Sequence, residues 1–573
     1  MSGRALSAGP WDVVVIGGGI TGAGILLEAA RRGLRALLVE QRDFAWGTSS
    51  RSSKLVHGGL RYLKEGQFGL TRESVHEREH LLRQAAGLVE PQSFAFGDYA
   101  GRKPGKRAFL VGLAIYDRMA GQRGRHYFER DAFMAMAPNV ATEGLQGGMV
   151  YMDAKTDDAR LVLRVLQEAR RHGGIALNYM AVESLLREGR PMANDARPAG
   201  SVRTGGQERS GEVCGVRLRD DLSGAQHEVR ARLVISATGA WADRLRVQHG
   251  RDGHPGDCQH GAETGVTVTA GGVATPGGGT AREGAARPKL RPLRGSHLVL
   301  PAWRLPLAQA ISLMHPSDGR PVFAYPWEGV TLVGTTDVDH AEDLSREAVI
   351  TRAECDYLMA ALRVQFPQLQ LGDDDIIATY AGVRPVIDSG KVDPSKAARD
   401  HVIWLEDGLL TVTGGKLTTF RVIALDALKL AATRLPELQD QLTPLPVFGA
   451  SLPLRYTPGL PPGQALRLQG RYGASAQALV DAAQEGELAN IPGTETIWAQ
   501  LRWAARHEDV CRLEDLLLRR TRIGIQLRGG GVGVLPRIRA ICQPELGWSD
   551  EQWAAEQEAY LALWATHYNL PKR

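Results

Sequence analysis

The sequence has 573 residues, of which 43% are hydrophobic and 23% are charged. These values are typical of a globular chain with several domains, and they exclude disordered, collagenous and coiled-coil proteins. The 69 basic and 64 acidic residues leave a formal charge of +5, which is too small for this length to indicate a nucleic-acid partner.

Cysteine usage and hydropathy restrict the class further. The cysteines form no C-x-x-C pair and no zinc spacing with histidine, so we expect reduced thiols in the cytoplasm and no metal site. They stand at Cys214, Cys258, Cys355, Cys511 and Cys542. No run of about 18 apolar residues occurs, and the N-terminus lacks the pattern of a signal peptide, so any membrane association would be peripheral.

The first forty residues predict a strand, a helix and a second strand. The apolar run Val13–Ile16 precedes a glycine-rich turn, the helical stretch Ile20–Arg32, a glycine stop and the apolar run Ala36–Val39. A crossover of this kind joins neighbouring parallel strands. The chain therefore opens with a doubly wound α/β domain of the Rossmann type.

The glycine-rich turn contains the pattern G-x-G-x-x-G at Gly17, Gly19 and Gly22. Between a strand and a helix, this pattern lets the backbone approach a pyrophosphate at the helix N-terminus. Glu40, at the end of the second strand, is placed to accept hydrogen bonds from a ribose. The pattern therefore predicts a dinucleotide site without deciding between FAD and NAD.

Alternating patterns after the first domain predict further strands. They are expected at residues 212–218 and 230–235, and in an antiparallel substrate-side sheet at residues 296–300, 322–325 and 330–334.

Two insertions and a helical region complete the organisation. Residues 187–211 are expected to form a long hairpin loop, and the glycine-rich residues 250–284 a flexible excursion. After the proline-rich sequence that follows Thr443, helical periodicity over 465–569 predicts an all-helical C-terminal domain.

A basic, hydroxyl-rich segment, GTSSRSSKLVHGGLRYL, occupies residues 47–63. Its side chains suit hydrogen bonds to phosphates and to a flavin edge, and a solvated loop is the alternative. Together with the glycine pattern, the segment resembles the FAD-dependent glycerol-3-phosphate dehydrogenases, whose motif S-S-K-L-x-H-G-G-L-R-Y-L it matches. Apart from the two insertions, the resemblance continues to about residue 430 through DDARLV (157–162), ATGAW (237–241), RGSH (294–297), GTTD (334–337), GVRP (382–385) and GGKLTT (414–419).

This resemblance implies an FAD-binding domain at 1–85, 150–249 and 376–442, interleaved with a substrate domain at 86–149 and 285–375. The insertion at 250–284 and a C-terminal helical domain at 443–573 complete the chain. No attachment motif is visible, so FAD is expected to bind noncovalently. The residues expected to contact FAD are Gly17, Gly19, Gly22, Glu40, Thr48, Ser49, Ser50, Lys54, Val182, Thr238, Gly239, Gly415, Lys416, Leu417 and Thr418.

The reaction that the resemblance implies is oxidation of sn-glycerol 3-phosphate to dihydroxyacetone phosphate, with hydride transfer to FAD and electron delivery to membrane quinone. Arg384 and Arg399 suit a phosphate because arginine forms bidentate, charge-assisted hydrogen bonds with its oxygens. Arg61, Thr335 and Lys416 are further substrate-binding candidates. Lys416 precedes a helix expected over 417–433 and is placed to stabilise the negative charge of reduced flavin.

Three residues are candidates for catalysis: His57, Arg384 and Lys416. His57 is the candidate base because the unperturbed pKa of histidine lies near neutral pH. A structural role for His57 is one alternative. Activation of the alcohol by Arg61 or Arg384 is another.

The basic residues at 102–107 lead into an apolar stretch at 109–116. This pattern predicts either an interfacial segment on the inner face of the membrane or a buried core helix. An oxidase that reduces oxygen to hydrogen peroxide, an amine or amino-acid oxidase of the same fold, and a non-catalytic flavin-binding regulatory protein stay open as alternatives. The sequence also leaves open whether the chain is a monomer or a homodimer.

Overall fold

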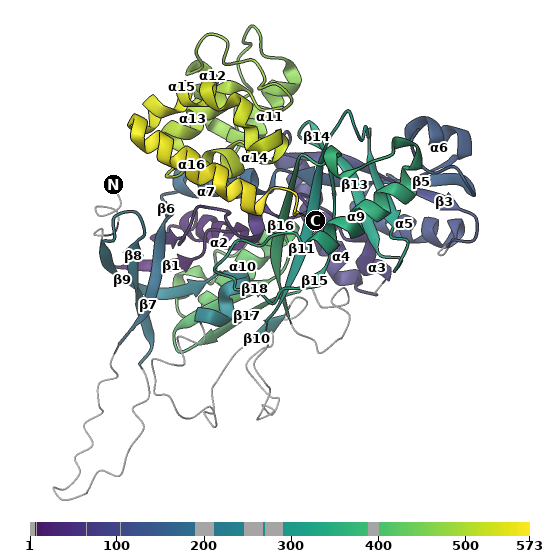
Figure 1. Cartoon of the computed structure of the whole chain (residues 1–573). Helices are drawn as coiled ribbons and strands as arrows, with labels where there is room; N and C mark the ends of the chain where they lie inside the picture. The colour runs from purple at the N-terminus through teal and green to yellow at the C-terminus, as the bar shows by residue number, and fades with distance from the viewer. Residues whose placement is uncertain are drawn as a thin grey trace, which may run out of the picture.

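The computed structural model describes residues 9–64, 66–102, 105–188, 211–245, 267–269, 290–387 and 400–572, together with Leu6. Two large β-sheets lie side by side in this part of the chain, and the C-terminal helices pack across them (Figure 1). The expected combination of a doubly wound domain, a second sheet and a helical C-terminal domain is confirmed.

The first sheet is built around β1 (Trp11–Ile16), which pairs in parallel with β2 (Ala36–Val39) and β9 (Gln226–Ser236). Parallel strands β6 and β18 extend it, and β17 and β10 continue it in antiparallel fashion. Their bounds are β6 (Ile175–Leu177), β10 (Thr267–Thr269), β17 (His401–Glu406) and β18 (Leu409–Gly414).

Both faces of this sheet are covered, as the run of buried residues in β1 requires. Val13 and Val15 pack into the core formed with the helices α2 (Ile20–Ala30), α7 (Asp158–Arg171) and α10 (Phe420–Ala431). Side chains alternate along a strand, so Val14 and Ile16 point to the other face. There they pack against the antiparallel strands β7 (Met180–Arg187) and β8 (Val213–Asp220). The predicted start of strand, helix and strand is confirmed.

The second sheet is antiparallel except where β12 pairs in parallel with β3. Its strands, in spatial order, are β15 (Val338–Asp339), β11 (Leu290–Pro301), β14 (Val330–Gly334), β13 (Pro321–Trp327), β12 (Ala310–Met314), β3 (Val89–Tyr99), β5 (Leu145–Thr156) and β4 (His126–Glu129), and β16 (Ala378–Ile387) also pairs with β11. Helix α9 (Arg352–Gln365) packs on one face, and C-terminal helices pack on the other.

The strand pairing differs from the expected domain boundaries at two places. β5 runs through residue 150 without a break, and β16 pairs with β11 from Ala378 to Ile387 instead of joining the first sheet. Arg384 therefore stands in the second sheet. The helix expected over 417–433 is a 3-10 turn, Leu417–Thr419, followed by α10.

The two insertions are described only in part. The flanking strands β7 and β8 pair with each other, but residues 189–210 lie outside the described residues. Within 250–284 the structure describes β10, which pairs with β17, and the rest of this segment also lies outside the described residues.

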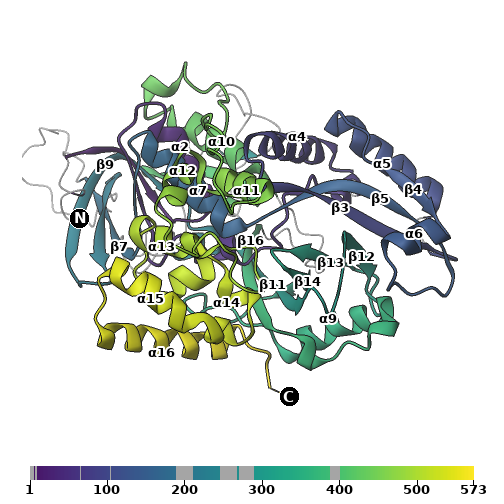
Figure 2. The ribbon, with the colours of Figure 1, turned by 90° about the horizontal axis from the view of Figure 1, so that it is seen from above.

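The remaining helices form two groups (Figure 2). α3 (Leu60–Lys64), α4 (Phe68–Gln84), α5 (Lys106–Ala120) and α6 (Arg130–Met136) accompany β3, β4 and β5. The C-terminal domain contains α11 (Pro462–Tyr472), α12 (Ala476–Asp481), α13 (Trp498–His507), α14 (Ile523–Gln526), α15 (Leu535–Leu546) and α16 (Asp550–His567). Among the described residues, no helix combines the length and the apolar character needed to cross a bilayer.

Candidate active site

The glycine turn between β1 and α2 leaves no room for larger side chains. Gly17 has φ +112°, a conformation that favours glycine, and a Cβ on Gly22 would lie 1.9 Å from the carbonyl oxygen of Gly17. Helix α2 begins after Gly19 and carries no acidic residue in its first turn. Its N-terminus can therefore receive an anionic group, and the turn fits a dinucleotide pyrophosphate.

Glu40 is held next to this turn by backbone hydrogen bonds. Its carboxylate accepts from the N–H groups of Gly18 (2.7 Å) and Arg42 (2.9 Å), although burial still raises its pKa. The N–H of Met180 donates to the carbonyl oxygen of Glu40 over 2.7 Å, and Val182 lies two residues further along β7. The predicted contacts Glu40 and Val182 therefore belong to neighbouring segments.

Thr238 and Gly239 lie where β1, β9 and β18 end. The N–H after β9, that of Ala237, donates to the carbonyl oxygen of Ile16 over 2.8 Å, and the Thr413 hydroxyl donates to the carbonyl oxygen of Gly239 over 3.0 Å. These are the carboxyl ends of parallel strands, where doubly wound sheets bind their ligands.

The loop from Gly47 to Gly58, which we call loop 47–58, connects the first sheet with the second. Its Ser49 hydroxyl accepts from the N–H of Ile20 at the start of α2 over 3.0 Å. Its Thr48 hydroxyl donates to the carbonyl oxygen of Val383 on β16, and its Ser53 hydroxyl lies 3.0 Å from Nε2 of His297 on β11. The loop therefore joins the nucleotide turn to two strands of the second sheet.

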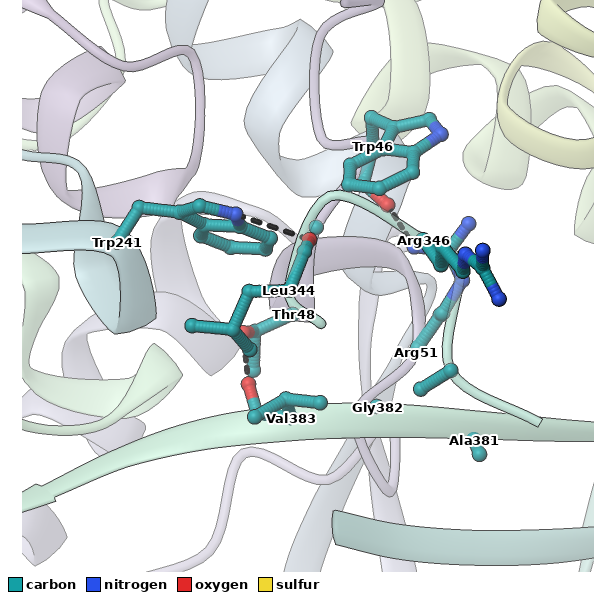
Figure 3. A pocket seen from close by; sticks show the side chains of 11 residues that line it. Trp46, Thr48, Arg51, Trp241, Leu344, Arg346, Ala381, Gly382 and Val383 are labelled. Carbon is teal, nitrogen blue, oxygen red and sulfur yellow. Dashed lines mark hydrogen bonds between the residues drawn. The ribbon is translucent and has the colours of Figure 1, made fainter. Parts of the chain in front are cut away.

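A pocket lies where loop 47–58 meets β16 (Figure 3). Trp46, Thr48 and Arg51 line it from the side of the loop, and Trp241 closes another side with its indole N–H donating to the carbonyl oxygen of Leu344 over 3.0 Å. Gly382 lines the pocket from β16, where a Cβ would lie 2.6 Å from the carbonyl oxygen of Arg51. Glycine is thus required for the approach of the loop to the strand.

Arg384 and Thr335, two of the predicted substrate contacts, meet in the second sheet. Nη2 of Arg384 donates to the Thr335 hydroxyl over 3.1 Å, and Nη1 lies 3.7 Å from Asp337. Gly295 on β11 makes the space for this pair, since a Cβ there would lie 2.3 Å from Arg384 Nη2 and 2.8 Å from Thr335 Oγ1.

His297 is a candidate that we did not single out from the sequence, although it ends the RGSH motif. Its ring is buried and stacks on Tyr380, with centroids 4.6 Å apart. Burial, together with the charges of Lys54 and Arg384, lowers its pKa well below the usual value, so the ring is neutral at pH 7. Among the described residues, Nδ1 of His297 has no hydrogen-bond partner. A neutral imidazole has a ring nitrogen that can accept a proton.

Lys416 follows two glycines with φ of +78° and +77°, Gly414 and Gly415, which turn the chain from β18 toward α4. Its Nζ donates to the Ser74 hydroxyl over 2.8 Å and lies 4.0 Å from the ring centroid of Tyr62. The Thr418 hydroxyl donates to the carbonyl oxygen of His57 over 3.3 Å. The GGKLTT motif and the end of loop 47–58 are therefore adjacent.

Two of the predicted substrate contacts lie outside the described part of the chain: Arg399, and the side chain of Arg61. No group of three or more histidine, cysteine or acidic side chains that could hold a metal ion occurs among the described residues.

Two family descriptions match the chain in succession. A model described as "FAD dependent oxidoreductase" matches residues 12–260 and 247–421. A model described as "C-terminal domain of alpha-glycerophosphate oxidase" matches residues 431–553.

Individual proteins are similar over nearly the whole chain. Aerobic glycerol-3-phosphate dehydrogenase of Staphylococcus aureus (strain USA300) is 32% identical over 536 residues, which cover 89% of this chain and 86% of the relative. The enzyme of the same name from Staphylococcus haemolyticus is also 32% identical and covers the same shares. Among solved structures, glycerol-3-phosphate dehydrogenase from Bacillus halodurans complexed with FAD superposes with a TM-score of 0.70 at 26% identity, over 99% of this chain and 97% of the other.

Proposed function

The chain belongs to the family of FAD-dependent glycerol-3-phosphate dehydrogenases, and we propose that it oxidises sn-glycerol 3-phosphate to dihydroxyacetone phosphate. The observation that carries this proposal is the contact of Arg384 with Thr335 next to Gly295, on strands that loop 47–58 joins to the nucleotide turn. A cation and a hydroxyl thus face the same small space from the second sheet. This arrangement suits a phosphorylated polyol.

We assign different residues of this chain to substrate binding, FAD binding and stabilisation of negative charge. Arg384 binds the phosphate through charge-assisted hydrogen bonds, and Thr335 orients it. The nucleotide turn, Glu40 and loop 47–58 hold FAD, which supplies the hydride acceptor when bound. Lys416 and the backbone N–H groups of the following 3-10 turn stabilise negative charge at the end of β18.

Two histidines compete for the role of general base. His297 is neutral and buried near Arg384, whereas His57 lies in loop 47–58 with its carbonyl oxygen bound by Thr418. We favour His297, because a base must be unprotonated at the working pH and lie near the substrate. This assignment replaces His57 as the base but keeps His57 as part of the site.

Single variants separate these two roles. His297→Asn is expected to lower kcat by about 100-fold and to remove the acid limb of the pH profile, with FAD retained. His57→Asn is expected to keep that limb. The opposite result, with the acid limb lost only in the His57 variant, would assign the base to His57.

An anaerobic titration tests the reaction itself. Adding sn-glycerol 3-phosphate to the FAD-loaded protein should bleach the flavin absorbance, and a quinone analogue should restore it quickly while air restores it slowly. Fast recovery in air with formation of hydrogen peroxide would make the protein an oxidase. A fully loaded flavin that glycerol 3-phosphate does not bleach would rule out the substrate and favour an amine oxidase or a regulatory protein.

Electron delivery to quinone requires contact with a membrane, for which we propose the outer face of α5. Leu113 and Tyr116 of this helix are buried, as the core alternative predicts, but Val111 and Ile115 are 61% and 38% exposed, with Arg107 and Arg118 on the same exposed side. An apolar stripe with flanking arginines is typical of a helix that lies in the interface of an anionic bilayer.

Vesicle binding tests this surface. The double variant Val111→Glu/Ile115→Glu is expected to lose binding to vesicles that contain anionic lipid and quinone, while its activity with a water-soluble acceptor stays unchanged. Leu222→Glu, at a residue that is 49% exposed in the turn between β8 and β9, is the matched control and should bind like the wild type. Equal binding of all three proteins would refute a membrane role for α5.

A further inference from the structure

The C-terminal domain reaches loop 47–58 through a buried arginine. The residues Asp515–Arg520 form a π-helical turn, and Arg522 after it has φ +65°, a left-handed conformation that is uncommon for a residue other than glycine. This local geometry turns the side chain of Arg522 inward, where it is 2% exposed. A π-helical turn followed by a left-handed arginine indicates a position that the surrounding structure constrains.

Arg522 shares its acceptors with Lys54 of the loop. The carbonyl oxygen of Ser50 accepts from Arg522 Nη2 over 2.6 Å and from Lys54 Nζ over 2.9 Å. The carboxylate oxygen Oδ1 of Asp158 lies 3.3 Å from Arg522 and 3.1 Å from Lys54. Two cations from different domains therefore hold one carbonyl oxygen and one carboxylate.

Asp158 also fixes the middle of the loop. Its Oδ2 accepts from the Ser52 N–H (3.0 Å) and from the Ser52 hydroxyl (2.8 Å). Asp158 and Lys54 have fully buried side chains, so water cannot replace any of these partners. Lys54 itself has φ +52°, so the loop leaves this cluster in a second left-handed conformation.

The held carbonyl belongs to the residue directly after Ser49, whose hydroxyl accepts from the first N–H of α2. A shift of the Ser50 carbonyl would therefore move Ser49 at the nucleotide turn. Lysine at position 522 could not reproduce the planar set of five N–H donors with which arginine binds two acceptors at once. Burial and the charge of Arg522 lower the pKa of Lys54 to about 7, so Arg522 supplies the cation of this pair that stays charged at neutral pH.

We propose that Arg522 is a positioning residue for FAD: it fixes the Ser50 carbonyl and Asp158, and through them it lets the C-terminal domain hold loop 47–58 in its FAD-binding conformation. The proposal rests on the contact of loop 47–58 with FAD that the proposed function assumes. It assigns a role in cofactor binding to a domain that supplies none of the nucleotide-turn residues.

The test compares FAD affinity with stability in stripped and reconstituted protein. Arg522→Gln is expected to weaken FAD binding by about tenfold or more, and Arg522→Lys by a smaller factor, as measured from flavin fluorescence. The matched control is Arg467→Gln, which removes another largely buried contact of the C-terminal domain, with Glu328 of the second sheet. It should lower the melting temperature but change the dissociation constant of FAD less than twofold.

Ser49→Ala separates the premise from the proposal. If Ser49→Ala and Arg522→Gln both bind FAD like the wild type, the loop does not contact FAD and the premise is wrong. If only Ser49→Ala loses affinity, Arg522 is merely structural. Failure of glycerol 3-phosphate to bleach the flavin would overturn the substrate and leave these affinities unaffected.

Hydrogen exchange of the wild type keeps the proposal testable if the Arg522 variants do not fold. Removal of FAD is expected to raise exchange in peptides that cover 47–54 and in peptides that cover 515–522, because coupling between the two sites is reciprocal. Peptides of α6, which packs on β4 and β5, should be unchanged. A response confined to 47–54 would overturn the proposal.

Discussion

The nucleotide turn and the substrate side of the site are built by opposite means. The turn consists of backbone: four glycines within the six residues 17–22, with φ +112° at Gly17 and no space for a Cβ at Gly22. The proposed substrate side consists of side chains from three separate strands or strand ends: Arg384 from β16, Thr335 after β14 and His297 from β11. Adding atoms to the turn should therefore weaken FAD binding, whereas removing atoms from the substrate side should impair the reaction with the substrate.

The largest effect is expected from Gly22→Ala. Its methyl group would collide with the carbonyl oxygen of Gly17, which is backbone and cannot rotate away, so the turn must open. We expect loss of bound FAD, measured by flavin absorbance per protein. Gly69→Ala in α4, where a Cβ meets nothing within 4 Å, is the control and should bind FAD fully. A Gly22 variant that holds FAD as tightly as the wild type would contradict the backbone character of this site.

Truncation of a side chain on the substrate side should lower kcat/KM while FAD stays bound. Arg384→Gln is expected to lower kcat/KM for glycerol 3-phosphate by about 10- to 100-fold, because hydrogen bonds to charged groups contribute roughly 1.5 to 3 kcal/mol. Arg320→Gln is the control, since Arg320 lies 3.4 Å from the same Asp337 but does not contact Thr335. Equal losses in the two variants would show that the charge around Asp337, and not a phosphate contact, sets the rate.

The same contrast explains which parts of the site could be predicted from the sequence. The nucleotide turn is contiguous, so the spacing of Gly17, Gly19 and Gly22 before a helix predicted both its place and its ligand class. The expected boundaries put Arg384 in the FAD-binding domain, whereas its strand β16 pairs with β11. This pairing joins residues about 90 positions apart, and no local pattern encodes it.

His297 was missed for a related reason. Its neutral state comes from burial next to Lys54 and Arg384, which lie far from it in the sequence, and this environment lowers its pKa. A histidine in a predicted strand carries no such signal. Only the RGSH motif pointed to the segment. For Arg522 the only signal was the run RRTR at 519–522, which resembles the helical domain of the same family.

Addition of atoms on the substrate side sharpens the comparison. A Cβ at Gly295 would meet the end of Arg384, a flexible side chain that can move, so the expected result is a rise of KM by about tenfold with kcat and FAD content nearly unchanged. Gly372→Ala, with open space around the Cβ, is the control for the loss of a glycine in the same domain. If Gly295→Ala instead released FAD, the two sides of the site would be one rigid unit.

The smallest expected effect is a change in how stability depends on pH. The pKa of His297 is lower in the folded protein than in the unfolded chain, where it is about 6.5, so the unfolded chain binds more protons between these two values. His297 therefore makes stability fall as the pH drops below about 6.5 and adds no slope above it, with a limit of about 1.4 kcal/mol per pH unit. Urea unfolding from pH 5 to 8 should show a shallower acid slope in His297→Gln than in the wild type, whatever the absolute stability of the variant. Parallel slopes would mean that the folded protein accepts the proton at no cost, and His297 would then lose the property that makes it a neutral base near Arg384.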